Sequence, residues 1–195
     1  LMLNLIALWK QEPRRPSGRQ AATEQPVFWK TWRLFMRAPG NLRFLVALAF
    51  GTMAFAMQDI ILEPYGGEVL GLTVAETTSL TALVAIGALV AFLGAAASIQ
   101  RGVSPTLVSS VGALVGVVAF SMVIFAHPLE SEGVFRVGTL LIGFGGGLFS
   151  IGTLTAALSL EENGLSGLAI GAWGAVFATS TGIAIAAGGI IRDLV

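Results

Sequence analysis

Residues 42–72 read LRFLVALAFGTMAFAMQDIILEPYGGEVLGL, an apolar run that ends in an acidic stretch with a proline and two adjacent glycines. A helix needs about 20 apolar residues to cross the hydrocarbon core of a bilayer, and residues 42–62 supply them. Asp59 and Glu63 lie near the end of this run. A carboxylate near the bilayer centre costs roughly 2.5–3.5 kcal/mol, so such acids are usually paired, protonated or functional. The stretch therefore predicts a membrane span and a candidate functional motif.

The rest of the chain has the same apolar character. Hydrophobic residues make up 55% of it, charged residues only 11%, and the mean hydropathy is +0.84. Apolar stretches of spanning length occur at residues 42–62, 79–99, 105–126, 137–160 and 165–191. We therefore expect an all-α membrane protein. Residues 1–8 are predicted to end a further transmembrane helix, residues 9–41 to form a linker loop, and residues 42–195 to form a half-bundle of five helices.

The distribution of basic residues predicts the orientation. The first loop and its borders carry Lys10, Arg14, Arg15, Arg19, Lys30, Arg33, Arg37 and Arg43, against Glu12 and Glu24. By the positive-inside rule this loop lies in the cytoplasm. Alternation then places residues 63–76 and 127–133 outside and the turn at Arg101 inside.

Within the loop, residues 27–37 alternate aromatic and basic side chains, which is typical of an amphipathic helix in the headgroup region. This helix would anchor the next span or, alternatively, dock another membrane protein.

Local sequence signals also predict where two helices begin. Thr73 and Glu76 have the spacing of a capping box, and Ser104 followed by Pro105 is typical of an N-cap and first helical residue.

Small residues are frequent within the spans. Gly112 and Gly116, and likewise Gly167 and Gly171, are four residues apart, the spacing at which helices in lipid approach closely. The four glycines in residues 143–147, GFGGG, weaken a helix by about 1 kcal/mol each relative to alanine, so a local break or a flexible point is expected there.

Several chemistries find no support. The sequence contains no cysteine, which excludes thiolate metal sites and cysteine nucleophiles in this chain, and its single histidine, His127, falls in a predicted loop. We therefore expect neither an enzyme nor a metal ion held by the protein.

Asp59 and Glu63 share one helix face, because they are four residues apart, and they lie at the negative end of the helix dipole. Water at the interface, protonation of one acid, or an ion pair with Arg136 on the same side of the membrane would each offset this cost. Pro64 is expected to stop the helix, and Gly66 and Gly67 to allow a tight outer turn.

Three segments together carry a family resemblance: LIALWKQE at residues 5–12, QDIILEPYGGEVLGL at residues 58–72 and GGIIRDLV at residues 188–195. In these, the chain resembles the PucC/LhaA family, the bacteriochlorophyll-delivery branch of the major facilitator superfamily. The resemblance implies a major-facilitator-type bundle in which the five spans are helices seven to eleven of twelve. The turn between the second and third spans departs from the facilitator pattern, since only Gln100, Arg101 and Gly102 remain of it.

The resemblance also implies a function. It implies a factor that assists assembly of light-harvesting complexes (LH1 and/or LH2) in the intracytoplasmic membrane of purple bacteria, with antenna polypeptides, the reaction centre and bacteriochlorophyll as partners. The functional motif would comprise Gln58, Asp59, Glu63, Pro64, Tyr65, Gly66 and Gly67. An axial ligand for the pigment's magnesium would come from Gln58, Asp59, Glu63, Asn163 or His127. The alternative is a proton- or ion-coupled transporter of a small solute, in which Asp59 or Glu63 titrates.

Overall fold

The computed structural model describes residues 28–159 and 166–194. These residues form helices joined by short turns, with no strand among them. The helices are α2 (Phe28–Arg37), α3 (Asn41–Ala56), α4 (Gln58–Pro64), the π-helix η1 (Tyr65–Val69), α5 (Val74–Gln100), α6 (Pro105–Ala126), α7 (Glu132–Ser159) and α8 (Ser166–Leu194). The segments predicted for residues 1–27 lie outside the described part, as does Asn163.

The five predicted spans are confirmed. Helical segments long and apolar enough to cross a membrane cover Asn41–Val69, Val74–Gln100, Pro105–Ala126, Glu132–Ser159 and Gly167–Ile191. The second and fourth begin five residues earlier than predicted, because polar first turns at Val74 and Glu132 precede the apolar stretches. The chain is therefore an all-α, multi-pass membrane protein.

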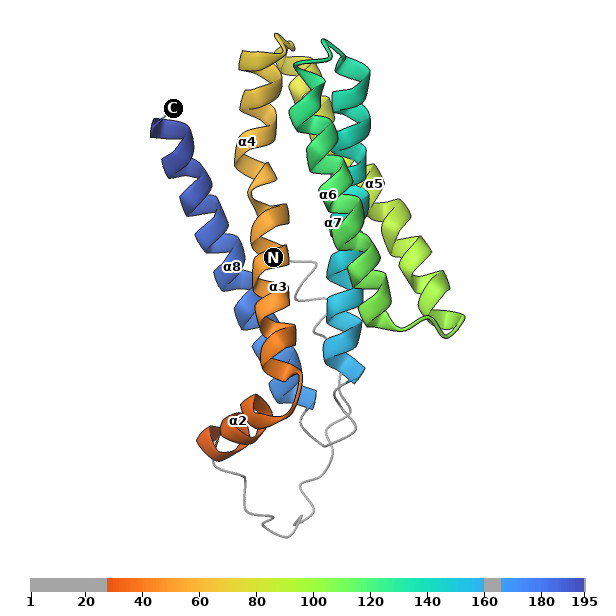
Figure 1. Ribbon diagram of the computed structural model, residues 1–195, viewed down its shortest axis with the longest axis vertical. Helices are drawn as coiled ribbons and strands as arrows, with labels where there is room; N and C mark the ends of the chain where they lie inside the picture. The colour runs from red at the N-terminus through yellow and green to blue at the C-terminus, as the bar shows by residue number, and fades with distance from the viewer. Residues whose placement is uncertain (1–27, 160–165, 195) are drawn as a thin grey trace, which may run out of the picture.

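Helix α7 forms the centre of the bundle and packs against both α5 and α6 (Figure 1). Its glycines make these contacts possible. A Cβ atom on Gly145 would lie 2.8 Å from the carbonyl oxygen of Gly112, and one on Gly152 would lie 2.5 Å from the backbone nitrogen of Ser109. On the other face, Gly143 and Gly87 meet backbone atoms of the facing helix. The small residues thus bring three helix backbones into direct contact.

The break predicted at residues 143–147 is wrong. Helix α7 is continuous from Glu132 to Ser159, and Gly143, Gly145 and Gly147 are buried against α5 or α6. Close packing on both sides offsets the low helix propensity of glycine, since any side chain there would separate the helices. The predicted contact role of Gly112 and Gly116 is confirmed, whereas no atom lies within 4 Å of the Cβ position of Gly167 or Gly171.

Helix α8 packs mainly on α3, which lies between α8 and the other three spans (Figure 1). Phe35, Leu45, Leu48, Phe149, Ala169 and Ala172 form the buried cluster at this junction. Phe35 belongs to α2, so its buried ring, with Trp32 and Met36 packed on the same cluster, fixes this short helix to the bundle. The side-chain amide of Asn41 donates to the carbonyl of Phe35 at 2.9 Å and closes the turn between α2 and α3.

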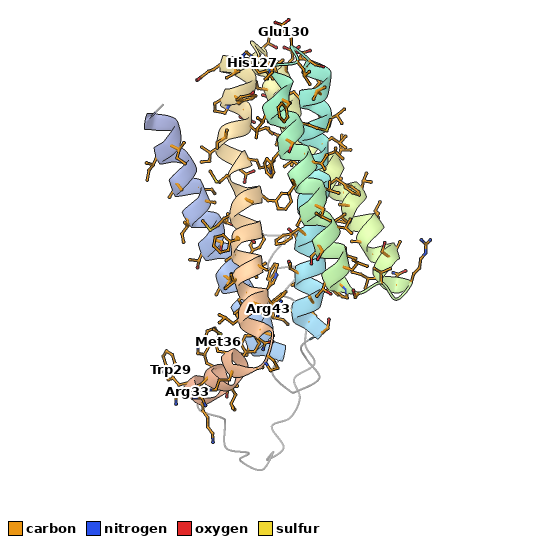
Figure 2. All side chains as sticks on the ribbon, in the orientation of Figure 1. Trp29, Arg33, Met36, Arg43, His127 and Glu130 are labelled. Carbon is orange, nitrogen blue, oxygen red and sulfur yellow. The ribbon has the colours of Figure 1, made fainter. Side chains whose placement is uncertain are left out.

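The two ends of the bundle differ in charge. In Figure 2, Arg33 and Arg43 lie at the end that carries α2, while His127 and Glu130 lie at the opposite end. Aromatic Trp29 and basic Arg33 both project from α2 there, as expected for an interfacial amphipathic helix. The arrangement agrees with a cytoplasmic α2 end and an outer end at the α6–α7 turn.

Candidate functional site

The candidate site forms where the first span is irregular. Helix α3 ends at Ala56, Met57 forms a turn, and α4 begins at Gln58. The backbone N–H of Ile60 donates to the carbonyl of Met57, three residues back, at 3.3 Å. This tightened turn places Gln58 and Asp59 side by side partway along the span, against α5, α7 and α8.

Gln58 and Asp59 are joined by a hydrogen bond. The side-chain amide nitrogen of Gln58 donates to Oδ1 of Asp59 at 3.3 Å. The amide oxygen of Gln58 is buried and has no hydrogen-bond partner. Because a buried unpaired acceptor costs roughly 1–3 kcal/mol, this oxygen needs an explanation.

A cavity of 320 Å³ lies beside this pair. Its polar wall includes Thr52 on α3, Gln58 and Asp59 on α4, Ser150 on α7 and Thr181 on α8. The hydroxyls of Thr52 and Thr181 are also buried without a partner. All three buried side-chain oxygens that lack a partner in the described part of the chain therefore line this one cavity. Sequence reasoning missed Thr52 and Thr181, because a single threonine in an apolar helix usually bonds to its own backbone.

Glu63 lies one turn further along α4 and lines a neighbouring cavity of 260 Å³ together with Gln58 and Asp59. Its Oε1 atom accepts a hydrogen bond of 2.9 Å from the hydroxyl of Thr81 on α5. The two acids therefore border a common space, as their spacing predicted. Among the described residues that line the 320 and 260 Å³ cavities, none is basic.

A third, apolar cavity of 450 Å³ lies between α4 and α6. Gln58 and Tyr65 line it, and its other walls are hydrophobic: Ala54, Met57, Ile61, Leu62, Phe120, Val123, Ile124 and Ile142. Gln58 thus stands at the border of all three cavities. Tyr65 lines the apolar cavity and packs against Phe135 with tilted rings, at a ring-centroid distance of 5.9 Å.

The α-helix α4 ends at Pro64, as predicted, but the helical segment does not end there. Pro64 lies inside the helix with a φ of −59°, and the chain continues as a π-helix to Val69. The backbone N–H of Leu70 donates to the carbonyl of Tyr65, five residues back, at 3.4 Å. A proline lacks one donor but has a helical φ, so a locally widened helix accommodates it.

The tight turn therefore comes later than Gly66 and Gly67, at Gly71, whose φ is +69°. Gly66 has a packing role instead. It is buried, and a Cβ atom there would lie 3.2–3.4 Å from side-chain atoms of Leu72, Phe135 and Leu80.

Arg136 has different partners from those expected. Its guanidinium lies 3.4 Å from Glu76 and 3.7 Å from Glu132, rather than with Asp59 or Glu63. Glu76 also caps α5, since its carboxylate accepts from the backbone N–H of Thr73 at 2.9 Å. Arg136 therefore pairs with Glu76 in the first turn of α5, because the outer ends of α5 and α7 are adjacent.

His127 lies apart from the Gln58–Glu63 segment. It is exposed at the α6–α7 turn (Figure 2) and lines a different cavity, of 420 Å³, with Val69, Leu70, Glu130 and Glu132. Over residues 28–159 and 166–194, no group of three or more histidine, cysteine, aspartate or glutamate side chains is placed to hold a metal ion.

A family model described as "PUCC protein" matches residues 1–195, the full chain. The chain belongs to the PucC family. It is 47% identical to Protein PucC of Rhodovulum sulfidophilum over 198 residues, a match that covers 100% of this chain and 44% of that protein. It is 48% identical to Protein PucC of Cereibacter sphaeroides, covering 98% of this chain and 42% of the relative.

A more distant PucC-family relative carries a different name. The chain is 30% identical to the Bacteriochlorophyll synthase 44.5 kDa chain of Rhodobacter capsulatus, over 100% of this chain and 46% of that protein. The chain thus spans less than half the length of these relatives. No solved structure matches it. Together, the family and the five spans indicate a multi-pass protein of the bacterial inner membrane.

Proposed function

We propose that this chain is part of a factor that assists assembly of bacterial light-harvesting complexes, LH1 or LH2. The observation that carries the proposal is the family match over all 195 residues, with relatives named PucC at 43–48% identity. Within the Gln58–Gly67 motif, Gln58 lines both the 320 Å³ polar cavity and the 450 Å³ apolar cavity. Family membership favours this function over a solute transporter.

The factor would bind or hand over bacteriochlorophyll. One relative has bacteriochlorophyll in its name, and the 450 Å³ cavity between α4 and α6 is of a size and apolar character that fit a small-molecule ligand or part of a larger one. The hydrocarbon tail of the pigment would occupy this cavity, because the tail has no polar group and most of the cavity wall is apolar.

When bound, the pigment supplies a magnesium ion that takes an axial oxygen or nitrogen donor. The buried, unpaired amide oxygen of Gln58 borders the apolar cavity and fits this role best. The carboxylates of Asp59 and Glu63 are the alternative axial oxygen donors to this magnesium. His127 fits poorly, because it lines a separate cavity at the outer end of the bundle.

Antenna and reaction-centre helices would dock on the lipid-facing side of the bundle. Large apolar side chains cover the outer faces of α5 and α6: Leu89, Val90, Leu93, Leu114, Val117 and Val118 are each more than half exposed. On α5 and α8, Gly94, Gly171 and Gly174 have open space at their Cβ positions. Small residues on an open helix face permit close approach of another transmembrane helix. In this role the protein acts by binding and performs no chemical step.

The test is purification of the tagged full-length protein from phototrophically grown membranes. We expect antenna polypeptides to co-purify, together with a near-infrared absorption band from bacteriochlorophyll. Gly171→Leu places a large side chain on the open face and is expected to reduce the recovered antenna polypeptides. Leu93→Ile, which keeps the size of an exposed apolar side chain on α5, serves as the control. Purified protein without antenna polypeptides and without pigment would contradict the proposal.

A further inference from the structure

The polar cavity beside Asp59 contains an electrostatic imbalance. Asp59 and Glu63 lie within a membrane span, and no basic residue is among the described residues that line their two cavities. Arg136, at the outer end of α7, is paired with Glu76 and Glu132. Glu63 accepts from Thr81, while the donor to Asp59 is the neutral amide of Gln58. The carboxylate of Asp59 therefore lacks a positive partner in the described part of the chain.

The hydroxyls of Thr52 and Thr181 indicate which kind of ligand neutralises the carboxylate of Asp59. Several hydroxyls elsewhere in the spans bond back to their own helix: Thr139 donates to the carbonyl of Phe135 at 2.9 Å, and Ser121 donates to that of Val117 at 2.7 Å. Thr52 and Thr181 make no such bond, although their oxygens are buried and Thr52 is only 4% exposed. Their oxygens therefore stay available to a ligand in the cavity, at a cost that an empty cavity would not offset.

We propose that the cavity lined by Thr52, Gln58, Asp59 and Thr181 binds a monovalent metal cation, sodium or potassium. The set supplies oxygen donors alone: two hydroxyls, one carboxylate and, while no pigment is bound, the amide carbonyl of Gln58. Oxygen donors suit hard cations. A single carboxylate balances one positive charge, and the set lacks the three acidic or imidazole ligands of a typical divalent site.

The backbone and the cavity size agree with this assignment. The site lies at the break between α3 and α4, and helix breaks in membrane proteins commonly flank sodium sites. The cavity of 320 Å³ exceeds the volume of a bare ion, so the cation would keep part of its water, at about 30 Å³ for each molecule. Because the four residues come from α3, α4 and α8, the cation would join α8 to the kinked span.

The inference does not rest on the proposed role in antenna assembly, and its test uses pigment-free protein. Thermal unfolding of the purified full-length protein in detergent is followed while choline chloride is replaced by sodium or potassium chloride at constant ionic strength. We expect Tm to rise along a saturating curve with at least one of the two ions, because a ligand that binds only the folded state stabilises it. Asp59→Asn is expected to abolish this rise.

Two isosteric variants keep the test independent of Asp59. Thr52→Val and Thr181→Val each remove one oxygen donor and should weaken the apparent cation affinity by about tenfold. Thr139→Val is the matched control, since that threonine is buried like Thr52 but its hydroxyl is satisfied by its own helix. It should keep the wild-type affinity.

Two outcomes would overturn the inference. The first is an identical Tm in choline, sodium and potassium, which would mean that water alone fills the cavity. The second is a wild-type cation response in both Thr52→Val and Thr181→Val, which would place any cation elsewhere on the protein.

Discussion

At the scale of single residues, close helix packing depends on glycines that face backbone. Gly145 is the clearest case, because a Cβ atom there would lie 2.8 Å from the carbonyl oxygen of Gly112 and 3.0 Å from the backbone nitrogen of Gly116. Gly94 on α5 has no atom within 4 Å of its Cβ position. The same residue type therefore has opposite roles at these two positions.

We predict that Gly145→Ala lowers the free energy of unfolding by about 1–3 kcal/mol, because α6 and α7 must separate to admit the methyl group. Gly94→Ala should be neutral or stabilising by up to about 1 kcal/mol, because alanine favours the helix. Thermal unfolding of the full-length protein in detergent measures both. Equal effects of the two substitutions would show that the contact between α6 and α7 is not as close as described.

Interactions of single residues could be predicted from the sequence only where the two residues lie close together in the chain. The capping box of Thr73 and Glu76 and the N-cap at Ser104 are confirmed, because each involves atoms a few residues apart. The partner of Arg136 could not be found in this way. Topology placed Arg136 on the outer side, but only the packing of α5 against α7 brings it to Glu76, 60 residues away in the chain.

At the scale of elements, the first span shows how a local rule is overridden. Pro64 predicts a helix end, yet the α4–η1 segment continues to Val69 because the chain widens after the proline. The side chains of Tyr65 and Leu70 then pack on the core cluster that contains Phe135. That packing comes from other helices and leaves no signal in residues 58–72 themselves.

We predict that Thr73→Ala destabilises the protein by about 1 kcal/mol, since Thr73 caps the N-terminus of α5. Thr78→Ala is the matched control, because Thr78 lies on the same exposed turn and bonds only to the carbonyl of Val74, at 2.8 Å. Comparison of the two Tm values checks the prediction. A loss in Thr78→Ala as large as that in Thr73→Ala would contradict the role of the cap.

A second prediction at this scale concerns the ion pair between α5 and α7. Arg136→Gln should cost no more than about 1 kcal/mol, because the side chains of Arg136 and Glu76 are 41% and 39% exposed. The measurement is again thermal unfolding, with the salt concentration varied. A cost that is large and independent of salt would indicate a buried network in place of an exposed pair.

At the scale of the whole molecule, the number of spans and their orientation follow from length and charge, which are properties of the whole sequence. The positions of the cavities do not follow from these properties. The 320 Å³ cavity combines residues of α3, α4, α5, α7 and α8, and Thr52 and Thr181 have no sequence pattern that sets them apart from other threonines. Gln58, Asp59 and Glu63 could therefore be identified from their unusual place in a span, whereas the oxygens of Thr52 and Thr181 could not.

The orientation of the spans in the membrane can be checked directly by cysteine labelling, because these 195 residues contain no cysteine that would interfere. A single cysteine at Ser131, in the α6–α7 turn, should react with an impermeant maleimide added outside intact spheroplasts. A single cysteine at Gly102, in the α5–α6 turn, should react only after the membrane is opened. The reverse pattern would invert the topology and place Asp59 and Glu63 nearer the cytoplasmic side.

The measurement that tests the central claim most directly is antenna assembly in cells that carry the Asp59→Asn, Glu63→Gln double variant of the full-length protein. Both changes keep side-chain size and remove charge. We predict that the near-infrared absorption of the antenna falls strongly while the variant protein accumulates in the membrane at its normal level, as measured by immunoblot. Wild-type antenna absorption in these cells would contradict the account, because the acidic motif would then have no part in assembly.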